Sequence, residues 1–229
     1  MEFAYPDSGL IGRKAWFMLD DEIVALGTGI TGHSAEPVQT IVENRKIRKD
    51  AGNRLLINGE EMPPKLGWNQ TIEGARWAHL EGNEDGADIG YVFPGAPTIS
   101  AKRETRTGSW YSLNRSQSKN GVTRNYVSLW FDHGREPKGA RYSYVLLPGK
   151  GAEETKAYSD KPDVEILSNT TELQAVREKE LGILAAILWR SGSIEYVQAK
   201  QKSAVLVREA GSELTFAASD PTQSQEQLT

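Results

Sequence analysis

Residues 16–46 read WFMLDDEIVALGTGITGHSAEPVQTIVENRK, and they decide the fold because strong strand patterns there meet an unusual placement of charge. Apolar runs at 15–19 and 23–30 flank the acids Asp20, Asp21 and Glu22. The pattern predicts two strands, or one long strand kinked at the acids. Acids between two runs that favour burial need a partner, and that partner could be a cation, a basic side chain or water.

The run at 38–46 alternates with a period of two, which predicts another strand. Strict alternation places Thr40 and Asn44 on one face and Glu43 and Arg45 on the other. Two interpretations of the pair Glu43 and Arg45 stay open. The carboxylate could orient the arginine or a partner across an interface, or the two residues could form a surface ion pair that contributes little to stability.

The rest of the chain predicts more antiparallel strands joined by turns. Asn58-Gly59 between LLI and EEM is a strong hairpin signal, and the acidic turn NEDG separates two aromatic strand patterns. The segment 171–189 contains good helix formers, but its apolar residues run continuously from 181 to 189 and therefore favour strand. Further strand patterns cover 75–82, 87–94, 100–113, 123–133, 141–148 and 203–218. This spacing predicts an all-β fold, a sandwich of antiparallel sheets.

The composition is that of a soluble globular protein and argues against several classes of function. The 229 residues carry a net charge of −4, which supplies no general field for nucleic acid. No apolar run approaches the roughly 20 residues needed to span a bilayer, so a membrane role is not expected. The absence of cysteine excludes disulfides and thiolate metal sites. The N-terminus lacks the pattern of a signal peptide, and a Met followed at once by strand-like residues favours a cut inside a larger protein.

Few side chains form a recognisable site on spacing alone. Three adjacent acids suit Ca²⁺, but on a strand they point alternately and converge only with the help of a bulge or of backbone carbonyls. The histidines His33, His79 and His133 show no metal-ligand spacing and no nearby GxSxG serine, so structural roles are expected. Five large aromatics could form a sugar-stacking platform or belong to the core: Trp68, Trp77, Trp110, Tyr111 and Trp130.

Eight runs, in order along the chain, resemble the central β domain of polysaccharide lyase family 8, which includes the hyaluronate, chondroitin AC and xanthan lyases. They are KAWFMLDDEIVALGTGI, PVQTIVENRK, RWAHLEG, DIGYVFPG, RTGSWYSLN, RNYVSLWFDHG, YSYVLLPG and LQAVR. The later segment SELTFAASDPTQ resembles the first strands of that family's small C-terminal β domain. The resemblance implies a galactose mutarotase-like antiparallel supersandwich over residues 1–200, without its first strands, and the start of the C-terminal domain over 201–229.

The family resemblance also implies a function for a whole enzyme. By these motifs the chain is similar to secreted bacterial lyases in which a helical toroid domain precedes the β domains. They cleave hyaluronan, chondroitin, xanthan or similar uronic-acid-containing polysaccharides by β-elimination, using Asn, His, Tyr and Arg side chains of the helical domain. The resemblance therefore implies a chain that is inactive alone and has two partners, the acidic polysaccharide and the helical toroid domain.

Two sites follow from the resemblance. Glu43 in TIVENRK matches a glutamate that approaches the catalytic cleft from the β domain and orients the arginine and tyrosine there. Asp20, Asp21 and Glu22 match acids that bind a structural Ca²⁺ in members similar to the xanthan lyases. In that arrangement a glutamate much later in the chain is the fourth acid.

The fourth acid is expected at Glu180, which is preferred because it directly precedes LGI. Glu178, two positions earlier on the same strand face, is the alternative. Two other classes of function compete with the lyase. The chain could be an independent carbohydrate-binding or scaffold module of lyase ancestry. It could also be a β-sandwich whose acids and aromatics serve only structure, in which case Ca²⁺ would leave its melting temperature unchanged.

Overall fold

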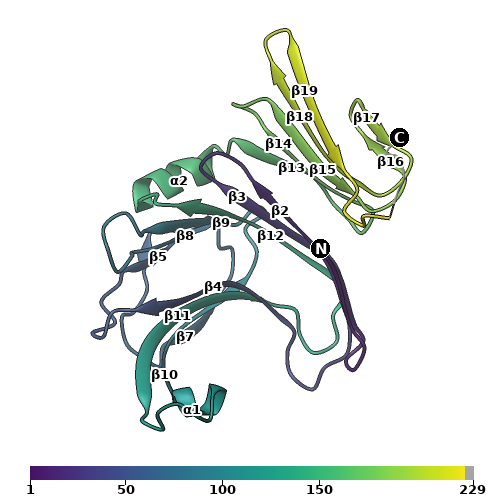
Figure 1. Ribbon diagram of the computed structural model, residues 1–229. Coiled ribbons are helices and arrows are strands. Elements are labelled where there is room, and N and C mark those ends of the chain that lie inside the picture. The colour runs from purple at the N-terminus through teal and green to yellow at the C-terminus, as the bar shows by residue number, and fades with distance from the viewer. Residues whose placement is uncertain (225–229) are drawn as a thin grey trace. The chain divides into compact units, whose positions relative to one another are not determined.

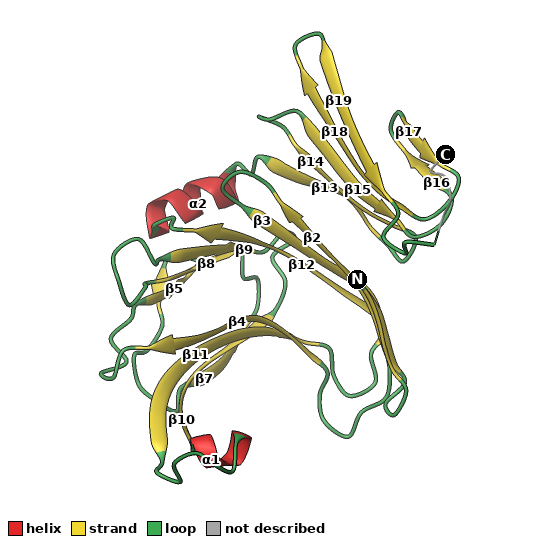
Figure 2. Cartoon of the chain, in the orientation of Figure 1, coloured by secondary structure: helices red, strands yellow, loops and turns green. Residues whose placement is uncertain are grey.

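The computed structural model describes residues 1–224 and contains nineteen strands and two short helices there (Figures 1 and 2). The all-β prediction, with antiparallel sheets, is confirmed. The strands fall into two units that each make most of their contacts internally. The first unit contains Met1–Ala35, Arg135–Ser143 and the described residues from Asp160 to 224, and the second contains Glu36–Gly134 and Tyr144–Ser159.

A hairpin in the first unit carries the three acids in its turn. Met18 pairs with Ile23, and the Leu19 N–H donates to the Glu22 carbonyl at 3.0 Å to close the turn. The predicted pair of strands is therefore confirmed, and the alternative of one kinked strand is wrong. The strands of this sheet are, in order, β1 (Glu2–Tyr5), β2 (Leu10–Met18), β3 (Ile23–Thr31) and the first part of β12 (Lys138–Pro148).

The first unit also contains a five-stranded antiparallel sheet. Its strands are, in order, β13 (Val164–Asn169), β14 (Leu173–Glu178), β15 (Ile183–Leu188), β18 (Ser203–Ala210) and β19 (Glu213–Ser219), and a separate pair is formed by β16 (Gly192–Ile194) and β17 (Val197–Ala199). Strand rather than helix over 171–189 is confirmed, as two strands. Because β18 pairs with β15, residues on both sides of the predicted domain boundary at 200 share one sheet.

Two sheets pack face to face in the second unit (Figure 1). The Phe131 ring contacts Phe93 edge-on, with centroids 6.0 Å apart, and also contacts Tyr144. The first sheet contains, in order, β4 (Gln39–Ile47), β11 (Val122–Asp132), β10 (Ile99–Gly108) and β7 (Asn69–Ile72). The second contains the last part of β12, β9 (Ile89–Val92), β8 (Trp77–Leu80), β5 (Leu55–Ile57) and β6 (Glu60–Glu61).

The predicted hairpin at Asn58-Gly59 is confirmed between β5 and β6. Both turn residues have positive φ, 53° for Asn58 and 87° for Gly59, which is the geometry that favours Asn-Gly in a two-residue hairpin. The Asn58 side chain also accepts from the Arg76 N–H at 2.8 Å. The aromatic strands on either side of NEDG pair as β8 and β9, also as predicted.

Two helices depart from the sequence prediction, which placed none. α1 (Trp110–Leu113) is a single turn with no buried residue. α2 (Ala152–Asp160) has one buried residue, Thr155, and lies against β9. A Cβ at Gly90 would lie 2.2 Å from the Thr155 hydroxyl, so the helix approaches the strand where there is no side chain. The helix has no apolar stripe, and therefore the periodicity that predicts helices is missing from it.

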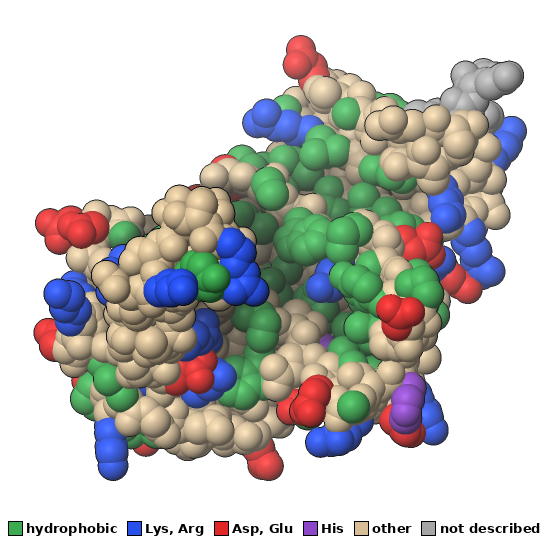
Figure 3. All heavy atoms as spheres, turned by 60° about the horizontal axis from the view of Figure 1, so that its bottom comes forward, with side chains coloured by type: hydrophobic (Ala, Val, Ile, Leu, Met, Phe, Trp, Pro, Cys, Tyr) green, Lys and Arg blue, Asp and Glu red, His purple; other side chains and the backbone are tan. Residues whose placement is uncertain are grey.

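Charges of both signs are interspersed on the surface. Figure 3 shows lysine and arginine side chains scattered among aspartate and glutamate on the face that it draws. Both helices in the described part of the chain are too short to span a bilayer.

Candidate functional site

β4 departs from regular pairing at one point, and that point sets the direction of Glu43. Leu129 of β11 pairs with Glu43, whereas the next residue, Trp130, pairs with Ile41, so β4 has one extra residue between them. Such a β-bulge shifts the alternation of side chains. Thr40 is buried before the bulge, and Glu43 turns to the same inward face after it. Strict alternation from Thr40 would have pointed Glu43 outward.

Glu43 and Arg45 share a face, as predicted, and contact each other. Arg45 Nε lies 3.3 Å from Glu43 Oε2, and Arg45 Nη1 donates to the Ala87 carbonyl at 2.8 Å. The Asn44 N–H donates to Glu43 Oε1 at 2.7 Å. The predicted grouping of Thr40 with Asn44 on one face is wrong, because the bulge puts Thr40 on the face of Glu43.

Tyr91 of β9 meets Glu43 from the facing sheet. The Tyr91 hydroxyl donates to Glu43 Oε2. Tyr91 is fully buried, and 14% of the Glu43 side chain is exposed. Burial raises the pKa of the Tyr91 phenol well above its usual value, and the charge of Glu43 raises it further. Burial and then Glu43 also raise the pKa of Tyr144 on β12. Tyr91 therefore stays protonated and remains a donor to Glu43.

The loop between β8 and β9 holds the carbonyl that binds Arg45. Gly82 packs so closely that a Cβ there would lie 2.5 Å from the Ala87 carbonyl carbon. Asp88 Oδ1 accepts from the Gly82 N–H at 2.9 Å, and Asp88 Oδ2 lies 3.0 Å from His79 Nε2. These contacts fix the Ala87 carbonyl in position for Arg45.

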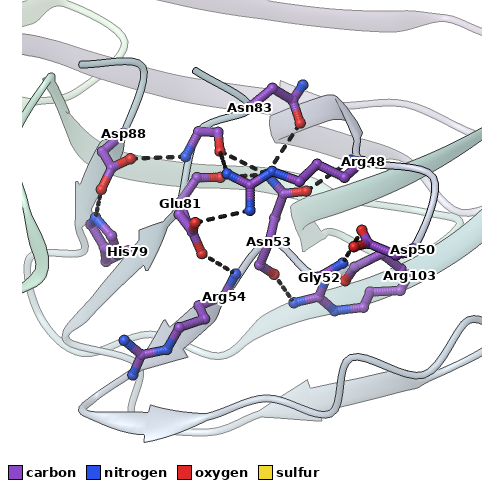
Figure 4. A network of polar contacts seen from close by, with 12 residues as sticks. Arg48, Asp50, Gly52, Asn53, Arg54, His79, Glu81, Asn83, Asp88 and Arg103 are labelled. Atoms are coloured by element: carbon purple, nitrogen blue, oxygen red, sulfur yellow. Dashed lines mark hydrogen bonds and ion pairs between the residues drawn. The ribbon is translucent and has the colours of Figure 1, made fainter. Parts of the chain in front are cut away.

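Asn53 ties the same loop to the segment after β4 (Figure 4). Its buried side chain donates through Nδ2 to the carbonyls of Glu81 and Gly82, at 2.9 and 3.0 Å, and to Asn83 Oδ1 at 3.2 Å. Its Oδ1 accepts from the Arg48 N–H at 2.8 Å. Figure 4 shows Arg48 beside Asn53. The Arg48 guanidinium donates from Nη1 to Glu81 Oε1 at 2.9 Å. The loop is therefore anchored by a polar network around the buried Asn53 side chain.

The turn between β2 and β3 brings the three predicted acids together, which an extended strand would not do. The carboxylate groups of Asp20, Asp21 and Glu22 lie within 4.8 Å of one another. The two aspartates are exposed, whereas Glu22 is 3% exposed. Glu22 Oε1 is buried without a hydrogen-bond partner among the described residues. The cluster therefore contains one buried carboxylate oxygen that lacks a hydrogen-bond partner among the described residues and could bind a cation.

Burial raises the pKa of Glu22 to about 8, and a hydrogen bond with Asp21 and the charges of Asp20, Asp21 and Glu178 add to this. A cation would stabilise the charged form that burial and the neighbouring acids disfavour. Carboxylate oxygens are ligands that suit Ca²⁺. The acids in this cluster therefore fit a hard divalent cation.

Of the two candidates for the fourth acid, Glu178 is the one whose charge acts on Glu22. Glu178 ends β14 and is buried, and its two oxygens accept from the N–H groups of Glu180 and Leu181. Glu180 lies exposed in the turn that follows. The sequence favoured Glu180 because it directly precedes LGI, and no pattern in the sequence signalled that Glu178 is buried at the end of β14.

Each histidine has a polar neighbour, which agrees with structural roles. His33 Nδ1 lies 2.9 Å from Glu136 Oε1 on the surface, and His133 Nε2 lies 2.9 Å from Thr40 Oγ1. His79 contacts Asp88 but has a buried Nδ1 with no partner among residues 1–224.

The five aromatics do not form one platform. Trp77 and Trp130 are buried in the second unit, with 6% and 8% exposed. Trp110 in α1 is 59% exposed, and Tyr111 beside it stacks against Arg115 and Lys119. Core and surface roles are therefore divided among them.

Two family descriptions match the chain. Residues 1–159 match "Polysaccharide lyase family 8, super-sandwich domain", and residues 165–229 match "Polysaccharide lyase family 8, C-terminal beta-sandwich domain". The change between the two descriptions lies between residues 159 and 165, earlier in the chain than the predicted boundary at 200.

Proteins of named activity are similar over nearly the whole chain. Xanthan lyase of Bacillus sp. (strain GL1) is 44% identical over 98% of this chain, and hyaluronate lyase of Thermasporomyces composti is 39% identical over 95%. These matches cover 25% and 27% of the two relatives, so the chain spans about a quarter of the length of the curated relatives it matches.

The same similarity holds in three dimensions. The structure of Paenibacillus xanthan lyase superposes on 98% of this chain with a TM-score of 0.96 and 41% identity, and this chain covers 22% of that one. A chondroitinase AC lyase structure superposes with a TM-score of 0.85 and 29% identity. Fold, motif order and family descriptions agree, and the chain belongs to polysaccharide lyase family 8.

Proposed function

We propose that this chain is the β-sandwich portion of a polysaccharide lyase and contributes Glu43 to the substrate cleft. The observation that carries the proposal is the restrained Glu43 carboxylate, which contacts Tyr91, Arg45 and the Asn44 N–H and has 14% of its side chain exposed. A carboxylate held in this way is suited to orient a donor that lies outside the chain. The xanthan and hyaluronate lyases that resemble the chain support the same class of reaction.

The proposed reaction cleaves the glycosidic bond next to a uronate. A base removes the proton on the carbon beside the carboxylate, the neighbouring carbon–oxygen bond breaks, and a carbon–carbon double bond forms between the two ring carbons. The leaving oxygen takes up a proton. Negative charge builds on the uronate carboxylate in the transition state, so donors and cations must surround it.

Glu43 accepts hydrogen bonds and carries negative charge, so it does not neutralise the uronate itself. We infer that it fixes the direction of an arginine and a tyrosine in a helical domain that precedes the β domains. Those side chains would face the substrate and move the proton. The substrate would be an acidic polysaccharide of the hyaluronan, chondroitin or xanthan type.

The test measures the rise in ultraviolet absorbance from the unsaturated uronate product, with each of the three polysaccharides. The complete enzyme is compared with the 229 residues alone. The proposal predicts turnover of one polysaccharide by the complete enzyme and no turnover by the chain alone. Robust turnover by the 229 residues would overturn the claim that the chemistry needs the helical domain.

We also propose a structural Ca²⁺ held by the turn between β2 and β3. Asp20, Asp21 and Glu22 would supply carboxylate oxygens, with Glu178 or Glu180 as the fourth acid. The raised pKa of Glu22 and its unpartnered Oε1 support the proposal. The bound ion would supply positive charge that joins the hairpin to the end of β14, and it is given no role in the reaction. Calorimetric titration of the metal-free enzyme with CaCl₂ tests for binding.

The exposed surface around α1 favours a second candidate function, a carbohydrate-binding module. Trp110 is 59% exposed, and the Tyr111 ring lies 4.9 Å from the Arg115 guanidinium and 4.8 Å from Lys119 Nζ. Exposed aromatic rings beside cations suit an acidic sugar chain. Calorimetric titration with hyaluronan, chondroitin and xanthan fragments tests it, since a binding module binds without the helical domain. A lack of heat with all three would count against this function.

A further inference from the structure

Both oxygens of the Glu43 carboxylate have neighbours within the second unit. Oε2 accepts from the Tyr91 hydroxyl and lies 3.3 Å from Arg45 Nε, and Oε1 accepts from the Asn44 N–H at 2.7 Å. A carboxylate offers about four acceptor positions in all. Three are occupied here, so one acceptor position on Oε1 is left for a further donor.

Tyr91 is the most rigidly held of these neighbours. It lies in the middle of the second sheet, where it pairs with Ala78 of β8 on one side and Leu146 of β12 on the other. Its side chain is fully buried. A packed ring of this size has no room to swing, and a buried hydroxyl needs a hydrogen-bond partner. The partly exposed Glu43 is therefore fixed by Tyr91, rather than Tyr91 by Glu43.

Arg45 restrains Glu43 from the strand side. Its guanidinium bridges two groups, because Nε contacts Glu43 while Nη1 donates to the Ala87 carbonyl. The Ala87 carbonyl is itself held by the packing of Gly82. The charge of Glu43 in turn raises the pKa of two phenols that face it, Tyr91 and Tyr144, after the larger effect of burial.

We propose that Tyr91 is a positioning residue for catalysis, which acts by directing the Glu43 carboxylate so that its remaining acceptor position meets the donor it must orient. Arg45 assists from β4. The proposal rests on the proposed function of Glu43 and extends it to a residue that never touches substrate. It predicts that the effect of Tyr91 on the reaction passes through Glu43.

The test uses the complete enzyme and Tyr91→Phe, which removes the hydroxyl and keeps the ring. We expect kcat to fall about tenfold or more while KM changes less than about twofold, because the substrate contacts remain and only Glu43 is misdirected. In the Glu43→Ala background, Tyr91→Phe is expected to lower kcat less than about twofold further. Residues that act as one unit show such non-additivity, whereas a general loss of packing would lower both backgrounds alike.

Tyr126→Phe is the matched control. Tyr126 pairs with Lys46 on the face of the sheet opposite Glu43, where its ring lies 4.4 Å from the Arg106 guanidinium. The same chemical change there is expected to leave kcat within about twofold of the parent enzyme. If Tyr91→Phe does not fold, Arg45→Gln makes the same measurement from the strand side, with the same expected dependence on Glu43.

Three outcomes decide the proposal. A fall in kcat from Tyr91→Phe that vanishes in the Glu43→Ala background supports it. A fall from Glu43→Ala with no effect of Tyr91→Phe, or an equal effect in both backgrounds, overturns the positioning role and leaves the proposed function standing. A Glu43→Ala enzyme with unchanged kcat overturns the proposed role of Glu43 and, with it, the role of Tyr91.

Discussion

The Ala87 carbonyl accepts a 2.8 Å hydrogen bond from Arg45 Nη1, although 42 positions separate the two residues in the sequence. This bond links the loop between β8 and β9 to the strand that carries Glu43. Changes in the loop can therefore reach Glu43 without touching it. Substitutions at the anchors of that loop therefore test how Glu43 is held in place.

Gly82→Ala is expected to destabilise the protein by about 1–3 kcal/mol, because overpacking forces backbone to shift. The new Cβ would lie 2.5 Å from the Ala87 carbonyl carbon, and backbone atoms do not yield as a flexible side chain does. Lyase activity of the complete enzyme is expected to fall as well, since the displaced carbonyl is the one that holds Arg45. Urea denaturation and a turnover assay measure the two effects.

Gly108→Ala is the control for that change, because nothing lies within 4 Å of a Cβ built there. It is expected to change stability by less than about 0.5 kcal/mol, as surface substitutions do. Equal losses of stability for Gly82→Ala and Gly108→Ala would show that the close approach of the loop at Gly82 does not contribute to stability.

Asn53→Ala is expected to lower stability by about 3 kcal/mol, because buried groups left without partners cost about 1–3 kcal/mol each. The change removes three donated hydrogen bonds and one accepted from the Arg48 N–H. Asn120→Ala in an exposed loop is the matched comparison, with an expected change below about 0.5 kcal/mol. The urea midpoints of the two variants test this, and coincident midpoints would contradict the network.

Glu22 gives a pH dependence whose direction follows from its raised pKa. The folded protein binds its proton up to about pH 8, whereas the unfolded chain releases it near 4.5. Without Ca²⁺, the free energy of unfolding is therefore expected to fall as pH rises from about 4.5 to 8. Glu22→Gln is expected to remove this slope, and Glu60→Gln on the exposed strand β6 to keep it. Melting temperatures across that range in chelator make the measurement.

Ca²⁺ is expected to raise the melting temperature at pH 8. A concentration of about 100 times Kd stabilises by roughly 2.7 kcal/mol, which corresponds to about 5–10 °C for a protein of this size. Glu178→Gln is expected to weaken Ca²⁺ binding more than Glu180→Gln, because Glu178 is the acid whose charge acts on Glu22. The reverse order in calorimetric titration would favour Glu180. An unchanged melting temperature would contradict the proposed calcium site.

The sequence predicted correctly those elements that are determined by residues close together in the chain. Asn58-Gly59 predicted its hairpin because its two positive φ angles are a property of those residues alone. The strands over 171–189 followed from a continuous apolar run, which suits a strand with neighbours on both sides. The contact between Glu43 and Arg45 followed from the two-residue period of a strand, because that period is unbroken between positions 43 and 45.

Longer alternation failed at the bulge between Ile41 and Glu43, because no glycine or proline marks it in the sequence. Tyr91 was not predicted as a partner of Glu43, because the two residues belong to different sheets and their contact depends on how those sheets pack. α2 was missed because its one buried side chain is a threonine. Each of these three features depends on tertiary packing, which the sequence pattern does not reveal.

The role of Glu43 in catalysis is tested by the turnover of the complete enzyme carrying Glu43→Gln, measured by the ultraviolet absorbance of the unsaturated product. Glu60→Gln serves as the control for loss of one acid from the same unit. The proposed role of Glu43 predicts that Glu43→Gln lowers kcat by roughly 100-fold, since misdirection of a catalytic group can cost that much, and that Glu60→Gln does not. A Glu43→Gln enzyme with the turnover of its parent would contradict it.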